Sequence, residues 1–226
     1  MATRVRVFSS SVGTKLLIGF TGLFLFIYLL VHVAGNLLIF LGPEVFNNYA
    51  YTMEVQNRLL PLIELLLLLV FVVHIFKTVK MFLENQSARP VRYVQKKFAG
   101  GPSRKTLAST TMIVSGLWLV MFLIVHVKAF RFSPEYVWRG GGRDLYRQEF
   151  ENLANPLIVG FYVLSMAIVG SHLWHGISSG CQSLGFDHPK WTPRILLASK
   201  LFATAIAVGF MIIAVWVYVN QPGGRI

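Results

Sequence analysis

Residues 16–41 read LLIGFTGLFLFIYLLVHVAGNLLIFL, an apolar run without a single Asp, Glu, Lys or Arg. A helix needs about 20 apolar residues to cross the hydrocarbon core of a bilayer. The run is therefore long enough for a transmembrane helix. It is too long for the core of a signal peptide and lacks a convincing cleavage site, so we expect it to be retained.

Four more stretches of this kind follow, so the sequence predicts five spans at about 15–41, 58–83, 107–131, 155–182 and 195–219. Pro61, Pro156 and Pro193 stand at or near the predicted helix starts, where a missing N–H costs little. Hydrophobic residues make up 55% of the 226 residues and charged residues 13%, about half the charged share of a soluble domain. We predict an all-α membrane protein: one transmembrane domain over residues 1–226, whose first four spans form an up-down bundle.

The basic residues lie between the apolar runs and therefore act as topology signals. The formal net charge of +12 would otherwise suggest nucleic acid, which this distribution argues against. Placing the amino terminus, the second loop and the fourth loop on one side puts 14 of the 21 Lys and Arg there, with 2 of the 9 Asp and Glu. The positive-inside rule then predicts a cytoplasmic amino terminus and a carboxy terminus on the outer side.

Five of the six histidines lie inside predicted spans, and each of the first four spans holds at least one: His32, His74, His126, His172 and His175. The sixth, His188, follows Asp187 in a polar stretch and is interpreted as a loop residue. Ionisable side chains at membrane depth are rare and usually face the bundle interior. One such histidine is most simply a helix-bridging hydrogen bond, but histidines in four successive spans indicate a shared chemical role.

Their depths in the membrane predict two pairs. His32 and His126 lie in the outer halves of two outward-running spans, whereas His74 and His172 lie toward the cytoplasmic ends of two inward-running ones. In an up-down bundle, spans one and three face each other across the core, as do spans two and four. Each pair can clamp a flat macrocycle, and two axial histidines leave haem iron with no open position, which suits electron transfer. We predict an outer haem b held by His32 and His126 and an inner haem b held by His74 and His172.

Other ligand sets fit less well. Zinc would require three or four ligands at one depth, and the single Cys181 and the absence of a CxxCH motif exclude covalent haem attachment. His175, one helical turn from His172, either replaces it as a ligand or hydrogen-bonds a haem propionate; spacing alone does not decide. A further alternative is a transporter or channel that uses the histidines as a proton relay. Such a protein would show no haem absorbance.

The fourth span carries the most specific motif. Residues 172–176 (HLWHG) and 178–185 (SSGCQSLG) resemble the fourth-span motif of the di-haem cytochrome b subunit of succinate dehydrogenases and fumarate reductases. Residues 15–22 (KLLIGFTG) and 31–36 (VHVAGN) are also typical of that family, and the resemblance covers nearly the whole chain. It implies five spans, ligands from spans one to four in the pairing above, and His172 rather than His175 as the ligand.

The resemblance also implies partners, although no dinucleotide fingerprint or cysteine cluster for dicarboxylate chemistry is present in this chain. A flavoprotein and an iron–sulfur subunit would dock on the cytoplasmic face of a bacterial-type inner membrane, near the basic residues between Arg89 and Lys105. Electrons would pass through the inner and then the outer haem and exchange with a membrane quinone, commonly menaquinone in di-haem members. The direction, succinate oxidation or fumarate reduction, is left open. A cytochrome b of a hydrogenase or formate dehydrogenase is the alternative.

Two carboxylates are candidates for proton transfer at the quinone. In relatives an acidic residue just beyond the outer end of span one takes part in quinol chemistry, and Glu54, 22 residues after His32, matches that position. A partly buried carboxylate near the outer haem can accept a proton from quinol, whereas a solvated loop carboxylate would have no such role. Glu64, at the start of span two, has no match in the family.

Overall fold

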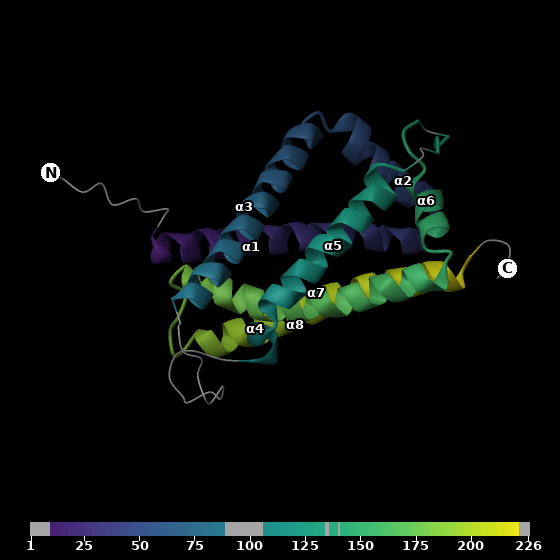
Figure 1. Cartoon of the computed structure of the whole chain (residues 1–226). Coiled ribbons are helices and arrows are strands. Elements are labelled where there is room, and N and C mark those ends of the chain that lie inside the picture. Colours follow the sequence, from purple (N-terminus) through teal and green to yellow (C-terminus); the bar gives the residue numbers. More distant parts are fainter. Residues whose placement is uncertain (1–9, 89–105, 134–135, 140, 222–226) are drawn as a thin grey trace.

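The computed structural model describes residues 10–88, 106–133, 136–139 and 141–221 (Figure 1). Within this part of the chain, five helices are long and apolar enough to cross a membrane, which confirms the five predicted spans. They are α1 (Ser11–Asn36), continued by the 3-10 helix η2 (Leu37–Leu41), then α3 (Leu60–Ser87), α5 (Met112–Arg131), α7 (Pro156–Ser183) and α8 (Thr192–Val219). The predicted docking segment lies almost entirely between residues 89 and 105, outside the described residues.

Local sequence explains where these helices begin. Pro61, Pro156 and Pro193 all lie in the first turn of their helices, as predicted. The third span begins at Met112 and not near residue 107, because Thr106 and Ser109 form a capping box for a separate short helix, α4 (Leu107–Thr110). The other predicted ends lie within four residues of the observed ones.

Short helices that the sequence did not predict close one end of the molecule, which we call the α2–α6 end. These are α2 (Pro43–Tyr51), the π-helical turn η3 (Thr52–Gln56) and α6 (Leu145–Asn152). The buried Asn47 joins them: its Nδ2 donates to Asp144 Oδ1 at 2.8 Å, and its Oδ1 accepts from the backbone N–H of Tyr146 at 2.9 Å. The α1–α3 and α5–α7 connections therefore form one structure over one end of the long helices.

Helices α1, α7 and α8 pack as a layer, and α3 and α5 run at a steep inclination to it (Figure 1). Small residues allow the close approaches within the layer. A Cβ atom on Gly19 of α1 would lie 3.1 Å from the carbonyl oxygen of Gly180 in α7, and one on Gly170 would lie 3.0 Å from Cβ of Ala207 in α8. Gly170 therefore has a packing role at the α7–α8 contact.

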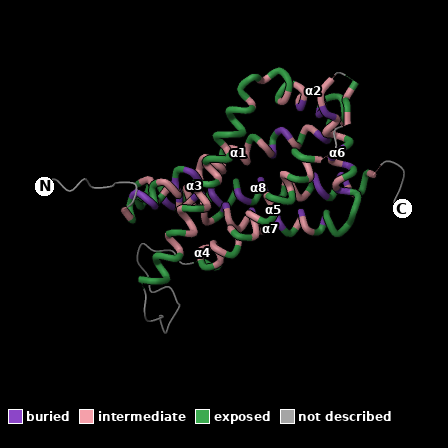
Figure 2. Tube along the Cα trace, turned by 45° about the horizontal axis from the view of Figure 1, so that its top comes forward, coloured by how far each residue is buried: buried purple, intermediate pink, exposed green. Residues whose placement is uncertain are grey.

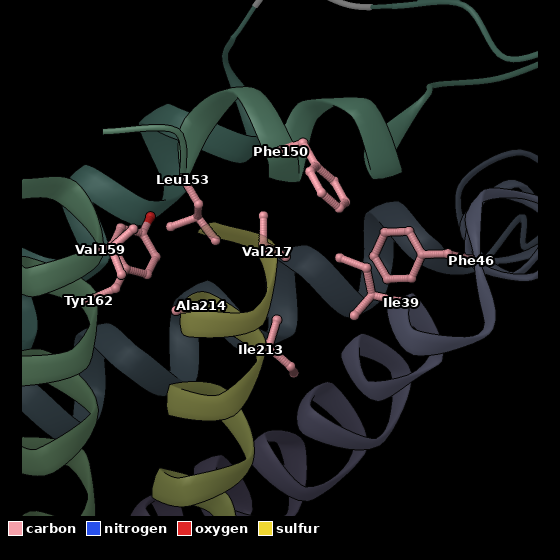
Figure 3. Packing of buried hydrophobic residues seen from close by; sticks show 9 residues of the cluster. All are labelled: Ile39, Phe46, Phe150, Leu153, Val159, Tyr162, Ile213, Ala214 and Val217. Carbon is pink, nitrogen blue, oxygen red and sulfur yellow. The ribbon is translucent and has the colours of Figure 1, made fainter. Parts of the chain in front are cut away.

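The buried residues follow the same division. They lie on α1, α7, α8 and the α2–α6 end, whereas none of the residues of α3 or α5 is buried (Figure 2). At the α2–α6 end, Ile39, Phe46, Phe150 and Val217 pack in one cluster with residues of α7 and α8 (Figure 3). A helix that is apolar all round and unburied by its own chain is suited to lipid. The chain is thus built as a multi-pass membrane protein.

Candidate functional site

The structure brings His32 of α1 and His126 of α5 together. Their ring centres lie 6.0 Å apart, with ring planes at 83°. Two metal–nitrogen bonds of about 2 Å each, and about 1 Å from each Nε2 to the centre of its ring, would separate two axial imidazoles by about 6 Å. The spacing between these two rings therefore fits a single metal ion between them.

His74 lies on α3 and His172 on α7, and they are the second predicted pair. Each imidazole lies against a glycine of a neighbouring helix: a Cβ on Gly22 would be 3.1 Å from Cε1 of His74, and a Cβ on Gly116 would be 3.6 Å from Cε1 of His172. Gly22 in particular leaves the space that the His74 ring occupies. Of the two predicted pairs, the rings of His32 and His126 lie against each other, whereas the pairing of His74 with His172 stays a prediction.

Hydroxyl groups set the orientation of the His74 and His172 rings. Thr21 Oγ1 lies 3.0 Å from His74 Nδ1, and Ser115 Oγ lies 2.9 Å from His172 Nδ1. Each hydroxyl has one proton and donates it within its own helix, Thr21 to the Leu17 carbonyl at 2.6 Å and Ser115 to the Met112 carbonyl at 3.0 Å. With the hydroxyl protons in these bonds, the oxygens would accept from Nδ1–H, and the neutral ring would then have a free lone pair on Nε2. That tautomer is the one a metal-ligating histidine with a second hydrogen bond uses.

The Nδ1 atoms of His32 and His126 have longer contacts. Tyr162 OH lies 3.5 Å from His126 Nδ1, and Asn36 Nδ2 lies 3.4 Å from His32 Nδ1. The Asn36 amide also donates to the His32 carbonyl at 2.8 Å, so this contact does not assign the tautomer. Aromatic rings pack on both imidazoles instead: Tyr28 stacks on His32 and Phe122 on His126, with ring centres 5.4 and 5.5 Å apart.

The two remaining histidines have different surroundings. His175 is partly buried one turn along α7, and its hydrogen bond within the described chain uses its backbone carbonyl, which accepts from Ser178 Oγ at 3.1 Å. His188 is exposed in a turn, where its Nδ1 accepts from the backbone N–H of Lys190 at 3.2 Å. The hydroxyl contact thus distinguishes His172 from His175, and His188 has the predicted place in a loop.

Nowhere in the described ranges do three or more His, Cys, Asp or Glu side chains converge on one point. Each histidine pair therefore offers two protein ligands, the number that haem iron needs when its macrocycle supplies the other four. Histidine side chains in otherwise apolar spans fit such a group.

The two candidate carboxylates lie near a cavity of about 410 Å³ at the α2–α6 end. Glu54, in η3, lines this cavity, and its Oε1 lies 3.4 Å from Nη1 of Arg143. Glu64, in α3, pairs with Arg131 at 3.3 Å, and both of these side chains are about half exposed. Glu54 is the less exposed carboxylate, at 25%, so the two candidates differ in their surroundings.

The sequence did not single out three of these residues by role. Thr21 and Ser115 had one signal, a small polar residue in an apolar span at the depth of a histidine in a neighbouring span. Arg143, only 9% exposed, had none, because an arginine after three glycines looks like any solvated loop residue.

Outside the spans, burial raises the pKa of the Glu149 carboxyl group in α6 to about 8.

A scan against protein-family models, a search of curated proteins and a search of solved structures each found no match to this chain.

Proposed function

We propose that the chain is the di-haem cytochrome b membrane anchor of a succinate:quinone oxidoreductase. The observation that carries the proposal is the contact between His32 of α1 and His126 of α5, together with the hydroxyl oxygens that lie beside Nδ1 of His74 and His172. Two neutral imidazoles per site, held with Nε2 free, suit bis-histidine ligation of a b-type haem. His32 and His126 hold the outer haem, and His74 and His172 hold the inner one.

The two haems, when bound, carry single electrons between an iron–sulfur subunit and a membrane quinone, with menaquinone as the expected type. The chain contributes the ligands and their orientation. It also excludes water, because the apolar side chains of the spans surround both histidine pairs. At the quinone, Glu54 exchanges a proton with the substrate, and the cavity at the α2–α6 end opens toward it.

The positive-inside pattern supports the orientation of the chain. The His74–His172 pair lies toward the cytoplasmic side, where a flavoprotein and the iron–sulfur subunit dock, and the α2–α6 end lies on the outer side of a bacterial-type inner membrane. Copurification tests the partners. A tagged chain isolated from its native membrane should bring down a flavoprotein and an iron–sulfur protein with succinate dehydrogenase or fumarate reductase activity. Recovery of a hydrogenase or a formate dehydrogenase in their place would contradict the proposal.

Removal of one hydroxyl acceptor should raise the reduction potential of the inner haem. An imidazole whose Nδ1–H is hydrogen-bonded is a more basic ligand and favours ferric iron. The change Thr21→Val or Ser115→Ala removes one such bond; about 1 kcal/mol for a hydrogen bond corresponds to about 40 mV for a one-electron couple. A redox titration followed optically measures the shift. Ser199→Ala is the matched control, because the buried Ser199 hydroxyl donates to the Ile195 carbonyl on α8. Equal potentials in all these variants and in the unchanged protein would refute the assigned tautomers.

A further inference from the structure

Arg143 is a nearly buried cation that joins three segments at the α2–α6 end. Its Nη2 donates to the Phe130 carbonyl at 2.6 Å and to Gln148 Oε1 at 3.1 Å, and its Nη1 lies 3.4 Å from Glu54 Oε1. Phe130 lies in the last turn of α5, Gln148 in α6 and Glu54 in η3. One guanidinium thus connects the helix that carries His126 to the carboxylate on the cavity wall.

The contacts on the two sides of this guanidinium differ in strength. The contact with the end of α5 is the stronger one, because carbonyl groups at a helix C-terminus attract a cation. Gln148 and Asn152 also hold this end of α5, since each donates a hydrogen bond to the Ala129 carbonyl at 3.0 Å. The contact with Glu54 is longer. The Glu54 side chain is 25% exposed, whereas that of Arg143 is 9% exposed. Arg143 is therefore the fixed partner, and the place of the Glu54 carboxylate depends on it.

The cavity has the size of a small-molecule site. Its volume of about 410 Å³ falls within the range of ligand pockets, which combine apolar walls with a few polar groups. Glu54, Arg131, Tyr136 and Arg143 supply polar groups, and Val55 and Val137 supply apolar surface. Under the proposed function, the ring oxygens of the quinone would lie among these polar groups.

We propose that Arg143 is a positioning residue of this site: it holds the Glu54 carboxylate on the cavity wall and compensates the negative charge that proton transfer moves into the cavity. The proposal rests on the proposed function of Glu54 at a quinone. It gives the connection between α5 and α7 a role in quinone chemistry in addition to its role in closing the bundle.

Charge balance shows why the cation matters. A quinol hydroxyl gives its proton to the Glu54 carboxylate, so the O–H bond of the quinol breaks and a carboxylic O–H bond forms. Glu54 becomes neutral, and the quinol oxygen keeps the negative charge. Arg143 faces a carboxylate before the transfer and a quinolate after it, and in the reverse direction the order is reversed. A fixed positive charge beside a developing anion in a partly dehydrated site is worth far more than in water.

The test compares Arg143→Gln, Glu54→Gln and the double variant in the purified complex, with a soluble menaquinol analogue as substrate. We expect Arg143→Gln to lower kcat with the quinol by about 100-fold, the low end of the cost of removing one charge-stabilising donor, and to change KM much less. The double variant should be no slower than Glu54→Gln alone, because residues that act through one another are not additive. Haem content and dye-linked activity should stay unchanged.

Two further variants separate positioning from a structural role. Gln221→Ala removes one hydrogen bond to α6, from Nε2 to the Phe150 carbonyl, without touching Arg143 or Glu54, and should leave quinol turnover normal. Arg143→Lys keeps the charge but cannot reach both the Phe130 carbonyl and Glu54, so we expect it to assemble and to recover only part of the rate. If Arg143→Gln does not assemble, the cycle is run with Arg143→Lys. Normal turnover in either Arg143 variant while Glu54→Gln is slow, or losses that add in the double variant, would overturn the role of Arg143 and leave the proposed function standing. Normal turnover in Glu54→Gln would instead remove the quinone role of Glu54.

Discussion

Replacement of His172 by leucine should reduce the haem content of the purified protein from two haems per chain to one. Leucine has no lone pair, so the inner iron would keep only His74 as a protein ligand, and the Ser115 hydroxyl would lose its contact with the imidazole. A pyridine haemochrome assay measures the loss directly. A redox titration should lose one of its two components, whereas the component due to the outer haem should persist, because His32 and His126 lie on other helices.

His175→Leu is the matched control, since it makes the same change one turn along α7. We expect this variant to keep both haems, because the hydroxyl contact and the glycine of the neighbouring helix are found at His172. A propionate contact of His175 would appear only as a shift of the inner-haem potential. Retention of both haems in His172→Leu together with loss of one in His175→Leu would show that the ligand has been assigned to the wrong residue.

Glu54→Gln should slow turnover with quinone by at least about 100-fold, the lower end of what a positioned acid–base group contributes. Glutamine keeps the size of the side chain and its hydrogen-bonding capacity but cannot accept the quinol proton. Haem spectra and the reduction of a soluble dye should remain normal, since Glu54 lies in η3, outside the histidine pairs. Parallel assays with quinone and with dye measure the two activities.

Glu64→Gln is the control for a carboxylate near the same end of the bundle. Glu64 is about half exposed and paired with Arg131, and exposed ion pairs contribute little, so we expect less than a twofold change in quinone turnover. Equal effects of the two substitutions would mean that the general loss of charge, and not the position of Glu54, matters. Normal quinone turnover in Glu54→Gln would place the quinone site elsewhere.

The sequence predicted the spans and the approach of His32 to His126 because both depend on distance along the chain. Apolar runs determine helix length, prolines mark the starts, and the position of a histidine within a run determines its depth. The sequence could not predict the rotation of each helix about its axis, because α3 and α5 are apolar on every face. The contacts of Thr21 and Ser115 with imidazoles depend on that rotation.

The α2–α6 end shows a second limit. Arg143 and Glu54 are 89 positions apart and meet only because α2, η3 and α6 fold over the bundle end. Asn47, which joins these helices, is buried. In the sequence it looks like any other asparagine in a loop. Contacts of this kind depend on tertiary packing, for which periodicity and composition provide no signal.

The content of haem per chain tests the central claim most directly. The protein is purified in detergent from haem-replete membranes, and its pyridine haemochrome spectrum is compared with the protein concentration from amino-acid analysis. The two histidine pairs predict two haems b per chain, a Soret band, and a low-spin spectrum of six-coordinate iron in both oxidation states. A protein of full helical content that shows no Soret band, or haem that binds with an open coordination position, would contradict the account.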